Sequence, residues 1–267
     1  MTSPSIVVKS TAKAILKGNY YKCICACLIC IFISLSLQLT ASLIGIAFGN
    51  VALYTLLSIL YFFLLFPTIL GLLRFFRHLM WDKNDNIIAV FYYFGSIKLY
   101  KKAIGSVFSF ILRLLLIGLA VYLPTILLTI LGMPQIYEFL GVAMPAFIRS
   151  IIETTTVFTV ISTVIYLILA VRYYMTPFLL VADEEMDVGE ALHMSKVISK
   201  KSALDFVGLV ISFSFWILIS LFIVPLPFTM PYIVLAYMVH CRFAVAHYNK
   251  IADSVNQNNI PFYSSDI

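Results

Sequence analysis

Three arginines lie within or at the edge of long apolar stretches, where a charged side chain is costly: Arg113, Arg172 and Arg242. A guanidinium at the centre of a membrane helix costs about 3 kcal/mol on insertion scales, so each must face protein or water, or reach the lipid surface. With His240 beside the last of them, they could bind the phosphate or carboxylate of an anionic lipid head group or solute. The alternative is that Arg172 and Arg242 snorkel to lipid phosphates while Arg113 bonds backbone carbonyls.

Two acids are candidates for intramembrane ion pairs with these arginines. Glu153 lies near the expected outer end of one apolar stretch, and Asp205 lies at the expected inner start of another. Asp205 is placed to reach Arg172 or Arg242, whereas Arg113 has no acidic neighbour at its depth. Because cations outnumber acids in the apolar interior, these residues favour an anionic guest.

Four cysteines lie close together near the N-terminus: Cys23, Cys25, Cys27 and Cys30. The first, third and fourth share one helical face, but the spacing is not that of a zinc knuckle and no histidine lies nearby in sequence. Small apolar packing residues are the favoured interpretation, and metal binding or lipid attachment is the alternative. The chain also lacks GxSxG, HExxH, Walker and Gly-rich phosphate motifs, so we expect no enzyme, no cofactor and no metal.

The acids between Asp183 and Glu190 are interpreted as a solvated loop and a helix cap rather than as a carboxylate site. Asp187 can cap a helix and Glu190 can return the hydrogen bond, which is the spacing of a capping box. Catalysis would need a paired acid and base or a metal constellation, and we find neither in this stretch.

Membrane-spanning helices must position these residues. The chain has 267 residues, of which 62% are hydrophobic and 11% charged, with a mean hydropathy of +1.03, whereas soluble domains average about 25% charged. From Cys23 to Leu73 it contains no Asp, Glu, Lys, Arg or His. A helix needs about 20 apolar residues to cross the hydrocarbon core. The sequence predicts an all-α integral membrane bundle of about six spans, at 23–47, 51–73, 104–131, 151–174, 206–224 and 231–249.

Basic residues give the orientation of the spans. Fourteen of the 18 Lys and Arg residues fall in four polar segments, which six spans place on one face. The positive-inside rule makes that face cytosolic, so both termini are expected on the inner side of the cell membrane. The expected domains are a cytosolic amphipathic segment at 1–22, a membrane domain at 23–249 and a polar cytosolic tail at 250–267. The formal charge of +6 fits anionic lipids of the cytosolic leaflet as partners, and we expect no nucleic-acid binding.

Each pair of spans is introduced by a short segment with an apolar stripe and a lysine-bearing end, at about 6–17, 86–102 and 187–201. Such segments can lie in the membrane interface as helices, with the stripe toward the acyl chains and the lysines toward the phosphates. Asp85 is a candidate cap for the second segment. Their recurrence allows a threefold repeat, although any membrane protein built from hairpins has amphipathic, lysine-bearing links.

Ala41, Gly45 and Gly49 form a ladder of small residues, four apart, that allows two helices to pack closely. The contact is either internal or between two chains, so a second copy or another membrane protein is a candidate partner. Gly49 and the following Asn50 also supply turn chemistry between the first two spans.

Several stretches carry a resemblance to a known family: AILKGNY at 14–20, the region 173–202 with VADE and ALHMSK, and Pro231-Tyr232 followed by 242–248. They resemble the uncharacterised prokaryotic membrane family called domain of unknown function nine-seventy-five. Ser199-Lys200-Lys201 departs from the Lys-Gly expected there. The resemblance implies a six-helix membrane bundle and carries over no catalytic residues. The family is also similar to the membrane domain fused to some glycerophosphodiester phosphodiesterases, which implies lipid-related work.

These observations support two main functional hypotheses. The first is transport or handling of an anionic lipid or solute in a cavity open to the cytosol, with Arg113, Arg172 and Arg242 meeting the anion. The second is a non-catalytic scaffold or assembly factor that holds partners through its amphipathic helices and small-residue ladder. An intramembrane enzyme is the least favoured. A polar cavity reached by the three arginines favours the first hypothesis, and a solid bundle with an exposed groove favours the second.

Overall fold

The computed structural model describes residues 4–49, 51–81, 86–131, 141, 146–220 and 225–255. Every regular element in these ranges is a helix, and in chain order they are α1 (Pro4–Phe48), α2 (Val51–Met80), η1 (Ile87–Phe94), α3 (Ile97–Leu131), α5 (Ala146–Ala170), η2 (Val171–Tyr173), α6 (Thr176–Ala182), α7 (Val188–Ser212), α8 (Ser214–Ser220) and α9 (Leu226–Val255). Five helical segments are long and apolar enough to cross a membrane. The pair α7 and α8, bent by 53°, makes a sixth if it is one span. The predicted fold class, an all-α protein with the helices of an integral membrane protein, is confirmed for the described residues.

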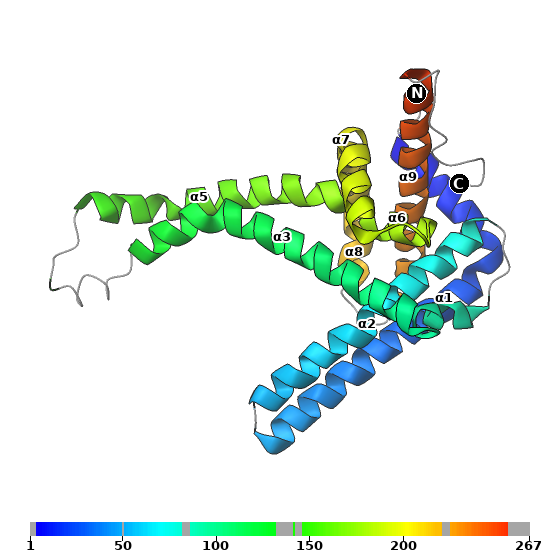
Figure 1. Ribbon diagram of the computed structural model, residues 1–267, viewed down its shortest axis with the longest axis horizontal. Coiled ribbons are helices and arrows are strands. Elements are labelled where there is room, and N and C mark those ends of the chain that lie inside the picture. The colour runs from blue at the N-terminus through cyan, green and yellow to red at the C-terminus, as the bar shows by residue number, and fades with distance from the viewer. Residues whose placement is uncertain are drawn as a thin grey trace.

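The long helices form three hairpins that diverge from a common base (Figure 1). The first pairs α1 with α2, the second pairs α3 with α5, and the third pairs α7 and α8 with α9. In the second hairpin only 6% of the most apolar window of either segment is buried within the protein. Apolar surface on this scale needs lipid or another helix to cover it, which is the situation of a helix within a bilayer.

The core lies at the base, where helices from all three hairpins meet. Large, fully buried side chains here come from α2, η1, α9 and the segment that contains α6, and they include Phe75, Phe76, Val90, Met175, Phe178, Leu235 and Met238. Removing side chains of this size from water contributes about 1.5–3 kcal/mol each. The base is therefore the part of the molecule that fixes the hairpins relative to one another.

The first half of α1 packs against protein rather than lying free on a surface. α1 is kinked at Asn19, and before the kink Val8, Ala12 and Leu16 are buried at four-residue spacing. Just after the kink, the Tyr20 hydroxyl donates to the carbonyl of Phe228 at 3.1 Å, which places this part of α1 beside the start of α9. The buried face is the one with Val8, Ala12 and Leu16, whereas Ile6 and Val7 of the stripe predicted at 6–17 are exposed, so the placement of that stripe in the membrane interface stays a prediction.

The same face of α1 continues through the cysteines. Cys23, Cys27 and Cys30 are buried, with Ala26 among them. Small side chains here let α1 lie close to both α2 and α9, with which it makes extensive contacts. Across the part of the chain that the structure describes, no group of three or more His, Cys, Asp and Glu residues is placed to hold a metal ion.

The other two amphipathic segments join their spans in different ways. The second is divided into the 3-10 helix η1 and the start of α3, and its candidate cap Asp85 lies outside the described residues. The third is continuous with α7, and the Asp187 carboxylate caps that helix by accepting the N–H of Gly189 at 2.9 Å. An extended Asp at this position satisfies one of the backbone donors that a helix start leaves unpaired.

Two members of the small-residue ladder pack within the chain, and the third makes a turn. Ala41 is buried, and a Cβ added to Gly45 would lie 3.0 Å from the Cβ of Tyr54 on α2. Gly49 has φ of +57° and follows the last residue of α1, with no atom near its Cβ position. A left-handed residue at this place is typically glycine because other side chains are strained there. The close contact at Gly45 is therefore internal to the first hairpin.

Candidate cavity between α1, α7 and α9

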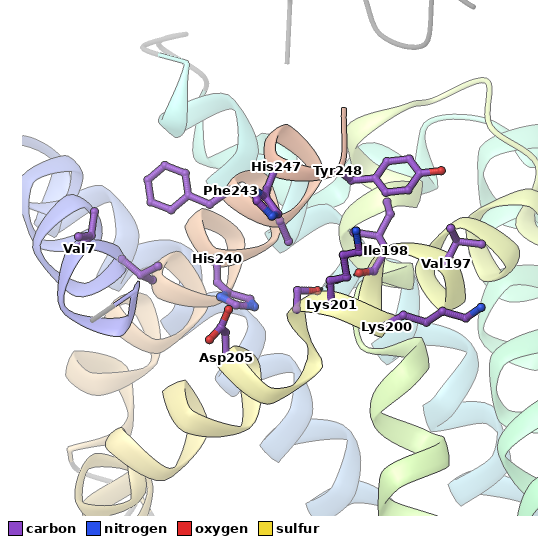
Figure 2. Close-up of a pocket in the computed structure, with 13 residues that line it drawn as sticks. Val7, Val197, Ile198, Lys200, Lys201, Asp205, His240, Phe243, His247 and Tyr248 are labelled. Carbon is purple, nitrogen blue, oxygen red and sulfur yellow. Dashed lines mark hydrogen bonds between the residues drawn. The ribbon is translucent and has the colours of Figure 1, made fainter. Parts of the chain in front are cut away.

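A cavity of about 610 Å³ lies between the start of α1, the middle of α7 and the end of α9 (Figure 2). Its volume falls within the range of small-molecule sites, about 300–1,000 Å³. Apolar side chains such as Val7, Val8 and Phe243 form much of its wall. Its charged or titratable lining includes Lys200, Lys201, Asp205, His240 and His247.

Helical periodicity puts these side chains on facing surfaces. On α7, Val197, Lys201 and Asp205 of the lining are four apart. On α9, the lining residues from His240 to Tyr248 recur every three or four positions. Residues with this spacing share one face of a helix. α7 and α9 thus form two walls of the cavity, and the start of α1 closes a third side.

A hydrogen-bonded cluster fixes His240 in the wall. The Tyr174 hydroxyl lies 3.0 Å from His240 Nε2 and 2.9 Å from Ser202 Oγ. The Tyr174 ring stacks on Phe206, with centroids 4.0 Å apart. The Tyr237 hydroxyl donates to the Tyr174 carbonyl at 2.8 Å. His240 is only 5% exposed, so its orientation is set by these partners rather than by solvent.

The charges of the lining favour an anion at the cavity mouth. Lys200 and Lys201 line the cavity and are exposed. Asp205 is the acidic residue among the described lining residues, so these three side chains together carry a formal net charge of +1. Figure 2 shows Asp205 and His240 pointing toward one another, while Lys200 and Lys201, which precede Asp205 on α7 by about one turn, lie apart from this pair. An apolar wall with a cationic edge is suited to an amphiphile that has an apolar body and an anionic head.

The three arginines of the sequence prediction do not converge on this cavity. Arg113 is exposed on α3. Arg172 is half-buried in η2, where its backbone carbonyl accepts hydrogen bonds from Ser195 and Ser199. The Arg242 guanidinium lies over the ring of Trp81, 5.0 Å from its centroid. Of the four residues predicted to bind an anion, only His240 lines the cavity.

The two candidate acids have different outcomes. Asp205 lines the cavity, and among the described residues no ion pair joins it to Arg172 or Arg242. The side chain of Glu153 lies outside the described residues. The sequence prediction did not include Lys200 and Lys201 in the site, because it took them for lysines facing lipid phosphates. The spacing of four residues between Lys201 and Asp205 is the available signal, whereas the five residues from Lys200 to Asp205 give none.

A second polar cluster at the base joins α2 of the first hairpin, η1 and the start of α3 to the link before α7. Glu184 Oε1 forms an ion pair with Arg74 Nε at 2.9 Å, and the Tyr92 hydroxyl donates to Glu184 Oε2 at 2.8 Å. Lys102 donates to the Glu184 backbone carbonyl. The Arg74 guanidinium also lies over the Tyr92 ring, 3.5 Å from its centroid. Glu184 is exposed, in keeping with the solvated link predicted for this acidic stretch, and in addition it ties α2 and η1 to the link before α7.

The environment of Glu184 lowers the pKa of its carboxyl below the ordinary value of 4.5. Partial burial is the largest single influence and raises that pKa, but the hydrogen bonds from Tyr92 and Arg74 and the charges of Arg74 and Arg77 together outweigh it. Burial, followed by the nearby Glu184 charge, raises the pKa of the Tyr93 hydroxyl to about 12. Tyr93 therefore stays neutral across the physiological range.

Acidification is expected to weaken the cluster through Glu184. A carboxyl whose folded pKa is depressed contributes stability above its unfolded pKa, near 4.5, and loses it as the pH falls through the folded value. Because the Glu184 side chain is 37% exposed, we expect a contribution of about 1 kcal/mol or less. Thermal unfolding of wild type and Glu184→Gln from neutral pH down to pH 3 measures it. The difference in Tm should shrink below pH 4.5, whereas the exposed Glu185→Gln control should change little at any pH.

Among known proteins, the chain matches one family. The family described as "Protein of unknown function (DUF975)" matches residues 1–247, which is most of the chain. No curated protein and no solved structure matches it.

Proposed function

The chain belongs to the DUF975 family of proteins of unknown function, and we propose that it is an integral membrane protein that handles an anionic lipid or solute. The observation that carries the proposal is the cavity between α1, α7 and α9, with its apolar wall and its two lysines. The role is non-catalytic and uses no cofactor. The resemblance to the membrane domain fused to some glycerophosphodiester phosphodiesterases supports a lipid over a water-soluble anion.

Binding in this cavity would divide the ligand between two environments. Acyl carbons would contact Val8 and Phe243, and a phosphate would accept hydrogen bonds from Lys200 and Lys201. Each lysine near an anionic lipid contributes about 1 kcal/mol, so the pair supplies about 2 kcal/mol of preference for a negative head group. His240, held by Tyr174, would offer a further polar contact inside the wall.

Neutralising the two lysines is expected to weaken binding of phosphatidylglycerol by roughly thirtyfold, which corresponds to about 2 kcal/mol. The measurement is the Kd of purified protein for a fluorescent phosphatidylglycerol, comparing wild type with a Lys200→Gln, Lys201→Gln variant. Lys196→Gln, an exposed lysine of α7 outside the cavity, is the matched control and should leave Kd unchanged. Arg113→Gln should also leave it unchanged, because Arg113 does not line the cavity.

A scaffold or assembly role is the alternative, and the same experiment separates the two. Equal binding by wild type and the double lysine variant would remove the basis for a lipid site. The small-residue ladder would not supply the partner surface, because Gly45 packs against Tyr54 within the first hairpin. The partner would instead bind the second hairpin, whose apolar faces are largely exposed. Reproducible crosslinks from α3 or α5 to one membrane protein would support that role.

We further propose that the protein lies in the cell membrane with both termini in the cytosol, which would open the cavity to the cytosolic side. The support is the crowding of lysines and arginines in the segments that six spans place together. Epitope tags at the two termini should resist protease added outside intact cells and be cleaved after permeabilisation. Cleavage of either tag in intact cells would contradict this orientation.

A further inference from the structure

η1 carries two rows of apolar side chains, one buried against the protein and one exposed. A 3-10 helix has three residues per turn, so residues three apart are eclipsed and form straight rows. Val90 and Tyr93 form the inner row and are buried at 0% and 3% exposure. The outer row is exposed by 38–75% and runs on into the first residue of α3: Ile88, Phe91, Phe94 and Ile97. This outer row has no covering element among the described residues.

The position of η1 along α2 sets its depth. η1 packs against α2 where Gly71 meets the Val90 backbone, and Tyr92 shares Glu184 with Arg74. The uncharged run of α2 ends at Leu73, so η1 lies beside the turn where that helix changes from apolar to charged. In a helix that spans a bilayer, such a change marks the level of the lipid head groups.

Charge and shape next to the outer row complement a lipid surface. Lys98 and Lys101 are exposed at the start of α3, and Lys101 lies one turn beyond Ile97 on the same side of that helix. An open groove of about 590 Å³ runs along η1 from Ile88 to Leu99. An apolar row flanked by lysines is the pattern of a segment that lies in the membrane interface.

We propose that η1 is a membrane anchor: its outer row enters the boundary between head groups and acyl chains, and Lys98 and Lys101 bind anionic lipid head groups. The occupant of this face is the bilayer that surrounds the protein's own spans. The inner row and the Glu184 cluster hold η1 against α2. Insertion of η1 would therefore fix the depth of the base relative to the bilayer surface. This surface is separate from the cavity and does not depend on the proposed function.

Depth-dependent quenching tests the insertion. The full chain is reconstituted in phosphatidylcholine vesicles with a fluorophore on Ile88→Cys or Phe94→Cys, and wild type gives the background from its native cysteines. Nitroxides near the top of the acyl chain should quench both labels roughly twofold more than nitroxides deep in the chain, and aqueous iodide should quench them weakly. A label on Glu185→Cys, in the exposed link before α7, should respond to iodide alone.

Labels at 88 and 94 that behave like the label at 185 would overturn the proposal. Crosslinking between two copies at Phe91→Cys, without lipid quenching, would overturn it in favour of a protein partner. For the lysines, nitroxide-bearing phosphatidylglycerol should quench the label at 94 about fivefold more per mole than the phosphatidylcholine analogue. That preference should be largely lost in Lys98→Gln, Lys101→Gln and kept in Lys196→Gln. Equal quenching by the two lipids in wild type would contradict the head-group contact.

Discussion

Gly71→Ala is expected to destabilise the protein by about 1–3 kcal/mol, or to displace η1 from α2. A methyl group at this position would overlap the Val90 carbonyl oxygen and lie 2.7 Å from the carbonyl carbon. The obstacle is backbone, which cannot move aside as the tip of a flexible side chain can. Val90 is itself fully buried, so a shift would disturb the core around it. Thermal unfolding in detergent measures the loss.

Gly105→Ala is the matched control because Gly105 also lies inside a long helix but has nothing within 4 Å of its Cβ position. Alanine favours a helix over glycine by up to about 1 kcal/mol, so this variant should be as stable as wild type or slightly more stable. The two substitutions add the same atoms and should act in opposite directions. Equal Tm values would show that η1 does not lie against α2 at Gly71.

The fold was predictable because its main determinant is the length of uncharged chain. No feature of composition distinguishes Gly71 from the other glycines, since its role comes from a backbone that approaches from η1, nineteen residues away at Val90. The stripe predicted at 86–102 contains Ile88, Phe91 and Phe94 of the outer row of η1. It does not separate that row from Val90 and Tyr93, because a helical stripe assumes 3.6 residues per turn and a 3-10 helix repeats every three. The lengths of the spans follow from local hydrophobicity, whereas these two features follow from tertiary packing.

The candidate site was predicted in part. Asp205 and His240 line the cavity, while Arg242 does not. Side chains two residues apart on a helix are rotated by about 200° around its axis. His240 and Arg242 therefore face opposite sides of α9. The depth expected from the sequence selects ionisable residues, but it carries no information about the direction each one faces. That direction decides which of them share a cavity.

The same limit applies to the acids and lysines near the base. The sequence does not predict the ion pair of Glu184, because its partner Arg74 lies 110 residues away. Lys102 was assigned to lipid and instead donates to the Glu184 backbone carbonyl. Long-range pairs of this kind depend on how the hairpins meet, which no local pattern encodes.

Tyr174→Ala is expected to cost about 3–5 kcal/mol, the range for removing a large aromatic side chain from a packed site. The Tyr174 ring stacks on Phe206, and its hydroxyl is shared between Ser202 and His240. Tyr174→Phe keeps the ring and removes the hydroxyl, which leaves two buried polar groups short of a partner and should cost about 1–3 kcal/mol. Thermal unfolding of both variants separates the ring from the hydroxyl.

Tyr21→Phe removes the same oxygen from a side chain that is 79% exposed, so it should change stability by less than about 0.5 kcal/mol. If Tyr174→Phe were equally harmless, the hydroxyl would not be what orients His240. The two Tyr174 variants also connect the fold to the cavity. Because Tyr174→Phe preserves the stacked ring, it should retain the cavity walls while releasing the His240 imidazole. A change in lipid affinity in that variant, with the Lys200 and Lys201 contacts intact, would therefore report on His240 itself.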